Sequence, residues 1–353
     1  MLTSIDRQDQ AGSHWLRMAL WLLSAMTGLF AQTGLAEPDF RADLQPRLRQ
    51  TVQHPTEGCT VTTQPTHLVV IMADQLRCDA LGAHTPNINA LAAEGMAFNQ
   101  AYCASPLCVP ARGSFFTGLY PNENGSIVNG WVPVDSHYGD VRDGIPSLYG
   151  LLQDGFDSWH TGKQHFMTRT RLQHDPAFER THWLNMEAGY KEHLQSHGKR
   201  SPGGPAFQGL LPELTQNSRT IPRYYSIPTT GCYPEDLAFF YDGYIKDCSL
   251  EAIRGRDRDK PFALNAMFVA PHPPLEIPEP WYSQIKAEDV QFPENVGVWA
   301  DGQSPLQLYN LPGFFGSKYS REDWQEVWRV YLGLVSLLDH CVGEIVQTLK
   351  DEG

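Results

Sequence analysis

A potential nucleophile and a cation lie close together between Cys108 and Arg112. Pro110 is suited to the first turn of a helix, so we expect Cys108 just before a helix N-terminus, where free N–H groups and the helix dipole favour negative charge. Arg112 follows four positions after Cys108 and can reach the same side of that first turn. The segment therefore combines a nucleophile, a cation and a helix N-terminus.

Asp74 is a second candidate because of where it falls in the sequence. It directly follows the apolar run Leu68–Ala73, which is typical of a parallel strand buried on both faces. Ligands of open α/β sheets collect outside the carboxyl ends of the strands, so an acid at this position can belong to a site. Taken alone, Asp74 could equally well cap a helix.

Three basic or titratable side chains follow two further predicted strands. Lys163 and His165 come after the predicted strand 156–160, and His272 comes after the predicted strand 262–269. Considered separately, Lys163 and His165 are more typical of a solvated lysine and a loop histidine, and an ordinary proline-rich turn is the alternative for the segment of His272.

The stretch from Cys103 to Gly118 resembles the signature of type I sulfatases in the alkaline-phosphatase-like superfamily, Cys-x-Pro-x-Arg followed by Thr-Gly. The segments Asp74-Gln75, 85–88 and 118–121 are also similar to the N-terminal half of that family. Gly162-Lys163-Gln164-His165 resembles the family's Gly-Lys-x-His motif, and His272 lies in a segment similar to its His-x-Pro loop. The resemblance extends from about His67 to the end of the chain.

The resemblance implies a definite chemistry. A formylglycine-generating maturation enzyme would oxidise Cys108, and the hydrated aldehyde would attack sulfur while Arg112 and Lys163 neutralise the sulfate. His272 or Lys163 would protonate the leaving alcohol, and His165 would help to expel sulfate.

A divalent metal is implied as well. Asp74, Gln75 and the modified residue 108 would be its ligands. Ca²⁺ is the first expectation, and Mg²⁺ or Mn²⁺ would also suit these oxygen donors.

The substrate class is less closely defined, because many sulfatases have a second Asp where this chain has Gln75. Asp74-Gln-Leu-Arg77 looks more like choline-sulfatases and phosphonate monoester hydrolases. We expect hydrolysis of a sulfate monoester, on a small molecule or a glycan. The alternatives are a phosphonate monoester or phosphodiester hydrolase, and an inactive fragment that binds sulfate or glycan.

The C-terminal part of the family pattern does not follow in this chain. In sulfatases the helix that matches residues 321–350 leads to a strand ending in Asp-His-Gly or Asp-Asn, which completes the metal site, and then to a smaller subdomain. The chain therefore looks truncated, and we expect it to bind metal poorly and to turn over slowly.

The elements that must position these residues indicate an α/β fold, with a mostly parallel central sheet and helices on both faces. Residues 166–250 are rich in aromatics, Gly and Pro and predict a loop-rich insertion. The elements predicted around it are strands at 68–73, 96–98, 156–160 and 262–269, and helices at 87–94, after Pro110, at 147–153 and at 321–350.

Composition excludes some classes of protein. The 353 residues are 41% hydrophobic, and 27 bases against 40 acids give 27 − 40 = −13, which disfavours nucleic-acid binding. The seven cysteines show no zinc spacing, and Cys232 with Cys248 is the easiest local pair.

The N-terminus predicts export. The apolar stretch Met18–Phe30 and the small residues Gly34 and Ala36 predict a signal peptide over 1–36. The stretch is too short for a stable membrane anchor. A secreted or periplasmic catalytic domain would then comprise residues 37–353.

Overall fold

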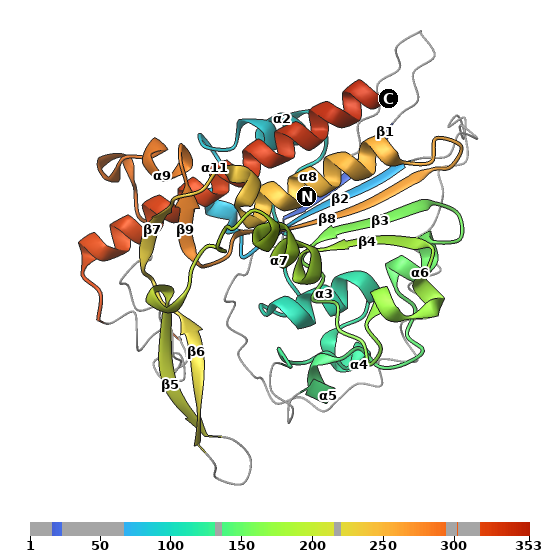
Figure 1. Cartoon of the computed structure of the whole chain (residues 1–353), viewed down its shortest axis with the longest axis horizontal. Coiled ribbons are helices and arrows are strands. Elements are labelled where there is room, and N and C mark those ends of the chain that lie inside the picture. Colours follow the sequence, from blue (N-terminus) through green and yellow to red (C-terminus); the bar gives the residue numbers. More distant parts are fainter. Residues whose placement is uncertain (1–15, 23–66, 131–135, 215–219, 294–301, 303–317) are drawn as a thin grey trace. The chain divides into compact units, whose positions relative to one another are not determined.

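A five-stranded parallel sheet forms the centre of the fold (Figure 1). The computed structural model describes residues 16–22, 67–130, 136–214, 220–293, 302 and 318–353. The strand order is β1-β2-β8-β3-β4, and every neighbouring pair is parallel. The strands are β1 (Leu16–Leu22), β2 (His67–Asp74), β8 (Phe262–Pro271), β3 (Asp157–Gly162) and β4 (Thr181–Asn185). The mostly parallel sheet expected from the sequence is confirmed.

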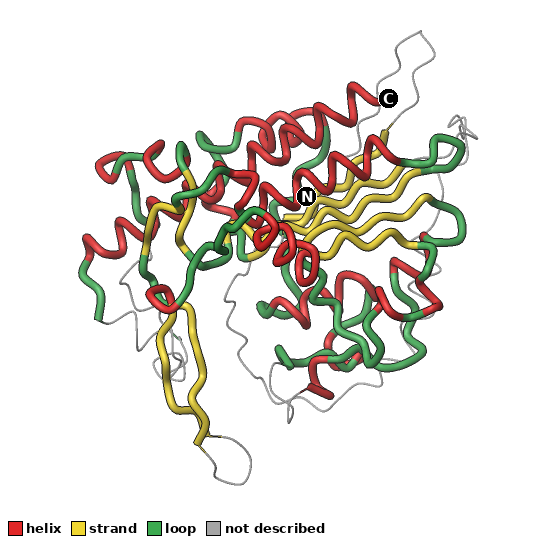
Figure 2. Tube along the Cα trace, in the orientation of Figure 1, coloured by secondary structure: helices red, strands yellow, loops and turns green. Residues whose placement is uncertain are grey.

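Helices cover both faces of this sheet, because β2 sends alternate apolar side chains to opposite sides. Val69 and Ile71 pack in one core with α2 (Pro86–Glu94), α8 (Tyr241–Gly255) and α11 (Arg321–Glu352). Val70 and Met72 pack in a second core with α3 (Cys108–Thr117) and α6 (Leu148–Leu152). Figure 2 shows the same division, with helices on either side of the yellow strands.

Smaller elements surround the sheet. An antiparallel hairpin extends away from it, and a two-stranded parallel pair lies beside the N-terminal half of α11. These elements are β5 (Gln208–Leu214) with β6 (Thr220–Ser226), β7 (Thr230–Tyr233) with β9 (Leu275–Pro278), and the helices α4 (Pro121–Asn124), α5 (Ser136–Gly139), α7 (Met186–Ser196) and α9 (Trp281–Gln284).

Two sequence-based expectations differ from the structure. The strand predicted at 96–98 is wrong: Met96 and Phe98 are exposed and lie in a loop, because a run of three residues finds no strand to pair with. Residues 166–250 are not a continuous loop region, since they contain β4, α7 and α8 as well as the hairpin. The short β4 shows no long apolar run, which is why its place at the edge of the sheet was not predicted.

The long helix α11 matches the predicted helix at 321–350 and packs in the core. By length and composition it could cross a membrane, but 72% of its most apolar window is buried inside the protein. Its Asp339 carboxylate accepts hydrogen bonds from the backbone N–H of Asn87 at 3.2 Å and of Ile88 at 2.8 Å. A carboxylate on these free N–H groups stabilises the start of α2.

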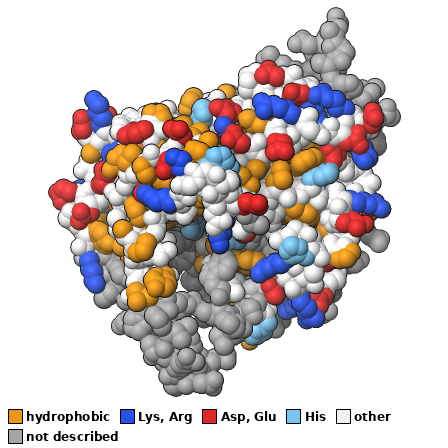
Figure 3. Space-filling model, in the orientation of Figure 1, with side chains coloured by type: hydrophobic (Ala, Val, Ile, Leu, Met, Phe, Trp, Pro, Cys, Tyr) orange, Lys and Arg blue, Asp and Glu red, His pale blue; other side chains and the backbone are white. Residues whose placement is uncertain are grey.

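The N-terminal apolar stretch contributes one strand to the sheet. Leu16–Leu22 forms β1, paired in parallel with β2, although the whole of this segment lies in the predicted signal peptide. The remaining residues of 1–36 lie outside the described residues. On the face drawn in Figure 3, basic and acidic side chains are interspersed.

Candidate active site

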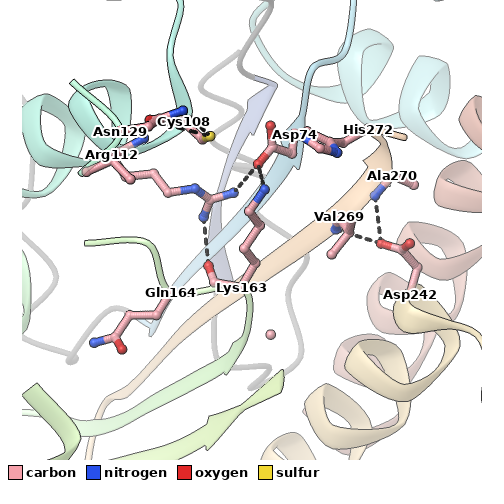
Figure 4. Close-up of polar contacts among 12 residues, drawn as sticks. Asp74, Cys108, Arg112, Asn129, Lys163, Gln164, Asp242, Val269, Ala270 and His272 are labelled. Atoms are coloured by element: carbon pink, nitrogen blue, oxygen red, sulfur yellow. Dashed lines mark hydrogen bonds and ion pairs between the residues drawn. The ribbon is translucent and has the colours of Figure 1, made fainter. Parts of the chain in front are cut away.

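Asp74 is the meeting point of two buried cations at the carboxyl end of β2. Its Oδ2 atom lies 2.6 Å from Lys163 Nζ and 3.2 Å from Arg112 Nη2. Arg112 also donates from Nη1 to the backbone carbonyl of Lys163 at 2.8 Å. In Figure 4 the two cationic side chains extend toward the Asp74 carboxylate from different elements. Residues 38 and 89 positions from Asp74 therefore form one charged cluster with it.

The geometry of Gly162 lets β3 deliver Lys163 to this cluster. Gly162 has a φ of 90°, a conformation that side chains rarely adopt, and a Cβ built there would lie 2.2 Å from the backbone oxygen of Met267 on β8. Only glycine permits this close approach of the two strands. Lys163 N then donates to the same Met267 oxygen at 2.9 Å, which fixes the start of the Lys163 side chain.

The charges hold Asp74 in its ionised form. Burial would raise the pKa of this carboxyl, but the neighbouring Lys163 and Arg112 outweigh burial and hold the pKa well below its usual range. Both cations are almost fully buried, so their attraction to Asp74 is poorly screened by solvent. An incoming anion would therefore meet two cations whose positions Asp74 already fixes.

Cys108 is the first residue of α3, within one position of the expected place. Asn129 holds this end of the helix: its Oδ1 accepts a hydrogen bond of 3.1 Å from Val109 N–H, and its Nδ2 lies 3.4 Å from Cys108 Sγ. Asn129 thus satisfies a free N–H group of the first turn and contacts the sulfur as well. Figure 4 shows Cys108 and Asn129 on the same side of the site as Arg112.

Both predicted histidines are held neutral in this environment. Burial, together with the charges of Lys163 and Arg112, lowers the pKa of His165 to about 2. Burial and the charge of Lys163 also lower the pKa of His272. His272 Nδ1 lies 2.6 Å from the backbone oxygen of Pro273. Because a carbonyl can only accept, Nδ1 carries the hydrogen and Nε2 of the neutral ring has a lone pair.

Asp242 supports the segment that carries His272. This fully buried carboxylate on α8 accepts hydrogen bonds from the backbone N–H of Val269 at 2.8 Å and of Ala270 at 3.0 Å, at the end of β8 (Figure 4). Burial, opposed in part by these two N–H groups, raises the pKa of Asp242 to about 6. The other oxygen, Oδ2, is buried without a hydrogen-bond partner among the described residues.

The side chains that the structure describes do not by themselves fit a hard divalent cation. Ca²⁺ takes six or more oxygen ligands, whereas Asp74 is the one carboxylate at the centre of this cluster and is engaged by two cations. No group of three or more His, Cys, Asp or Glu side chains within the described ranges could hold a metal ion. Gln75, the other expected ligand, is exposed, has a φ of 61° and directs its backbone oxygen to Tyr331.

The structure thus gathers Asp74, Arg112 and Lys163 in direct contact, with His272 and His165 close enough to exchange electrostatic effects with them. The sequence did not indicate Asn129 or Asp242, because each acts through a contact with a distant backbone segment that leaves no local motif. Six cysteines in the described part of the chain are free thiols. The local pairing of Cys232 with Cys248 is therefore wrong: Cys232 is exposed, whereas Cys248 is buried on α8.

Comparison with known proteins gives a consistent assignment. The sulfatase family profile matches residues 66–353. The chain is 25% identical to an arylsulfatase of Clostridium perfringens over 310 residues, which cover 81% of this chain and 60% of the relative. It is 24% identical to the choline-sulfatase of Rhizobium meliloti over 312 residues, which cover 82% of this chain and 55% of the relative.

The fold is shared with solved structures. The phosphonate monoester hydrolase of Agrobacterium radiobacter superposes with a TM-score of 0.60 at 20% identity, covering 82% of this chain and 60% of the other. The phosphonate monoester hydrolase of Silicibacter pomeroyi superposes with a TM-score of 0.58 at 21% identity, covering 82% of this chain and 60% of the other. This chain therefore spans about 60% or less of the proteins it is compared with here. Since the profile covers most of the sequence and includes every residue of the Asp74 cluster, the chain belongs to the sulfatase family.

Proposed function

We propose that the chain carries the catalytic site of a sulfuric ester hydrolase that cleaves a sulfate monoester, with Cys108 as the position of the formylglycine nucleophile. The observation that carries this proposal is the convergence of Arg112 and Lys163 on Asp74 beside the start of α3. Membership of the sulfatase family and the similarity to proteins named arylsulfatase and choline-sulfatase support it.

The two cations provide what a sulfate ester requires. Its anionic oxygens repel nucleophiles, so the site must neutralise their charge, and Arg112 and Lys163 are fixed in place to do so. Asp74 holds both cations in position before the substrate arrives, which removes part of the ordering that the reaction would otherwise need. Formylglycine at position 108 would supply a hydrated aldehyde oxygen as nucleophile, at a helix end that favours negative charge.

The protonation states divide the proton-transfer roles. His272 is neutral with a lone pair on Nε2, so in this state it accepts a proton rather than donates one. Lys163 carries three donor hydrogens and contacts the same carboxylate that His272 influences. We therefore assign the protonation of the leaving alcohol to Lys163 and a proton-accepting role to His272.

Mass spectrometry and turnover together test the nucleophile assignment. After coexpression with a formylglycine-generating enzyme, mass spectrometry of the peptide containing residues 103–112 should show conversion of Cys108 and an unchanged Cys103. Aryl sulfate hydrolysis should disappear in Cys108→Ala and persist in Cys103→Ala, a half-buried thiol of the same loop. An unmodified thiol at 108 in an active preparation would refute the assignment.

The role of Lys163 can be measured by titration with inorganic sulfate. Lys163→Met keeps an unbranched side chain that is one atom shorter but removes the charge, and it should weaken sulfate binding at least tenfold, about 1.4 kcal/mol. Lys191→Met, an exposed lysine on α7, is the matched control and should bind sulfate like the wild type. Equal affinities for wild type and Lys163→Met would remove the main support for a sulfate site.

A phosphonate monoester or phosphodiester hydrolase is the second candidate. The Asp74-Gln75 pair favours it, and two solved phosphonate monoester hydrolases share the fold. Specificity constants for an aryl sulfate and an aryl phosphonate distinguish the two functions. A phosphonate preference of tenfold or more, about 1.4 kcal/mol in transition-state binding, would favour this candidate.

We also propose that the protein is exported, on the basis of the apolar stretch and the small residues before Glu37. Cleavage there would remove β1 and leave β2 at the edge of the sheet. N-terminal sequencing of the protein from the culture medium or periplasm should begin near Glu37. A start at Met1 in exported protein would contradict cleavage.

A further inference from the structure

A cavity of about 520 Å³ lies directly beside the candidate active site. Gln75, which follows Asp74, and His272 form one part of its wall. Most of the remaining wall is apolar or aromatic and comes from the end of β6, the segment around residue 292 and the first half of α11. Its principal members are Tyr225, Phe292, Trp324, Val327, Trp328 and Tyr331.

The cavity adjoins the Asp74 cluster at Gln75 and His272. His272 lines the cavity and also exerts an electrostatic effect on Asp74. Gln75 is tied to the aromatic wall, because its backbone oxygen accepts a hydrogen bond of 2.9 Å from the Tyr331 hydroxyl. A substrate whose anionic group lies at Arg112 and Lys163 therefore has this cavity available for the rest of the molecule.

The wall does not suit a quaternary ammonium group. Such cations bind to open aromatic faces, but the Trp328 ring already stacks on Tyr331, with ring centres 5.1 Å apart and planes at 11°. The guanidinium of Arg77 lies 5.3 Å from the centre of the same Trp328 ring. At this part of the wall a second cation would meet a ring that is already occupied.

The wall offers few groups to a sugar. Arg77 is engaged by Asp79 through two hydrogen bonds of 2.8 and 2.5 Å. The Tyr331 hydroxyl donates its hydrogen to Gln75 and accepts from Arg77 N–H, so it has no hydrogen left to donate. Sugar hydroxyls buried here would lose hydrogen bonds to water and find few replacements among the described side chains.

We propose that this cavity binds the alcohol part of the substrate and selects a fused-ring, mainly apolar alcohol such as a naphthol. The proposal rests on the function proposed above. A cavity of this size holds ligands much larger than a short alkyl chain, and aromatic walls contact flat apolar rings favourably. The ester oxygen of such a substrate would lie at the His272 side of the cavity, next to the cations that bind the sulfate.

Binding of the free alcohol tests the cavity separately from catalysis. Calorimetric titration should show that 2-naphthol binds and that choline does not. Trp328→Ala should weaken 2-naphthol binding roughly tenfold. Trp281→Ala is the matched control, because Trp281 is another half-buried tryptophan that packs beside α11 without lining the cavity, and it should change the affinity less than twofold.

A second variant guards against a folding defect in Trp328→Ala. Val327→Phe fills the cavity without removing a packed side chain, and it should weaken 2-naphthol binding while leaving thermal unfolding close to that of the wild type. The proposal would be overturned if the protein bound choline but not 2-naphthol. It would also be overturned if Trp328→Ala and Trp281→Ala weakened 2-naphthol binding equally.

Rates of hydrolysis separate this proposal from the proposed function. The matured protein should hydrolyse 2-naphthyl sulfate at least tenfold more efficiently than ethyl sulfate, and Val327→Phe should reduce that ratio. Sulfate hydrolysis with no naphthyl preference and no 2-naphthol binding would reject the cavity and leave the function standing. Trp328-dependent 2-naphthol binding in a fully matured protein that hydrolyses neither ester would support the cavity and reject the function.

Discussion

The hydroxyl of Tyr331 donates a hydrogen bond of 2.9 Å to the backbone oxygen of Gln75, 256 positions earlier in the chain. The same hydroxyl accepts from Arg77 N–H at 2.9 Å. Gln75 has a φ of 61°, which is uncommon for a residue other than glycine, and it directly follows Asp74. The helix α11 thus stabilises the turn from which Asp74 reaches Arg112 and Lys163.

Tyr331→Phe should therefore affect the site more than the stability of the fold. It leaves a backbone donor and acceptor without their partner, which we expect to lower the free energy of unfolding by about 1–2 kcal/mol. Sulfate binding should weaken as well, because the turn after Asp74 loses its support. Tyr190→Phe removes a comparable hydroxyl, bonded to Phe239 O at 2.7 Å away from the site, and should not change sulfate binding. Equal sulfate affinities in the two variants would contradict this role of Tyr331.

Asp74→Asn should destabilise the protein, because it leaves two buried cations without their counter-charge. Breaking a buried ion pair by removing one partner costs about 3–5 kcal/mol, and we expect a loss near the lower end since nearby water can relax the site. Urea unfolding measures the change. Asp79→Asn, in the exposed pair with Arg77, should cost less than about 1 kcal/mol. If Asp74→Asn and Asp79→Asn lowered the free energy of unfolding by similar amounts, the Asp74 cluster would not be desolvated.

Gly162→Ala should separate β3 from β8. The added Cβ would lie 2.2 Å from Met267 O, and the φ of 90° is unfavourable for alanine. We therefore expect the free energy of unfolding to fall by at least about 2 kcal/mol and Lys163 to be displaced. Gly155→Ala, where nothing lies within 4 Å of the added Cβ, should stay within about 0.5 kcal/mol of the wild type. The check is thermal unfolding of the two variants, and a tolerated Gly162→Ala would refute the close approach.

Asp242→Asn should change how stability depends on pH. The pKa of Asp242 in the folded protein, about 6, lies above its ordinary value of 3.8. Between these two pH values the folded chain keeps a proton on Asp242 that the unfolded chain has released. The stability contributed by this proton is full below about pH 4 and is lost as the pH rises through 6, by up to roughly 3 kcal/mol. Asparagine keeps an acceptor for Val269 and Ala270 N–H but cannot ionise.

Unfolding free energies of Asp242→Asn and wild type, measured between pH 4 and 8, should therefore diverge in favour of the variant as the pH rises. Asp154→Asn, in an exposed pair with Arg180, should follow the wild-type profile. Parallel profiles for Asp242→Asn and wild type would mean that Asp242 does not titrate in this range.

The parts of the site that could be predicted from the sequence are those whose signal is local. Cys108 and Arg112 fall within one turn of a helix, and Asp74 directly follows an apolar run, so short patterns were sufficient to identify them. Lys163 and His272 were identified because the short segments that contain them resemble motifs of the sulfatase family. Parallel strands bring such positions to one edge, which is why separate motifs converged.

The remaining parts depend on contacts between distant segments. Asn129 acts on Val109, Asp242 acts on the end of β8, and Tyr331 acts on Gln75. Each contact joins a side chain to backbone groups of another element, so neither composition nor periodicity reveals it. The edge strand β4 escaped prediction for a related reason, since a five-residue strand takes its identity from its neighbour β3.

The central position of β8 constrains the order of events during synthesis. β8 lies between β2 and β3, yet it begins at Phe262, long after both of these strands have left the ribosome. At about 5–20 residues per second, roughly ten to thirty seconds separate the appearance of Cys108 from that of the end of β8. Throughout that interval the segment around Cys108 belongs to a nascent chain without a completed sheet to bury it.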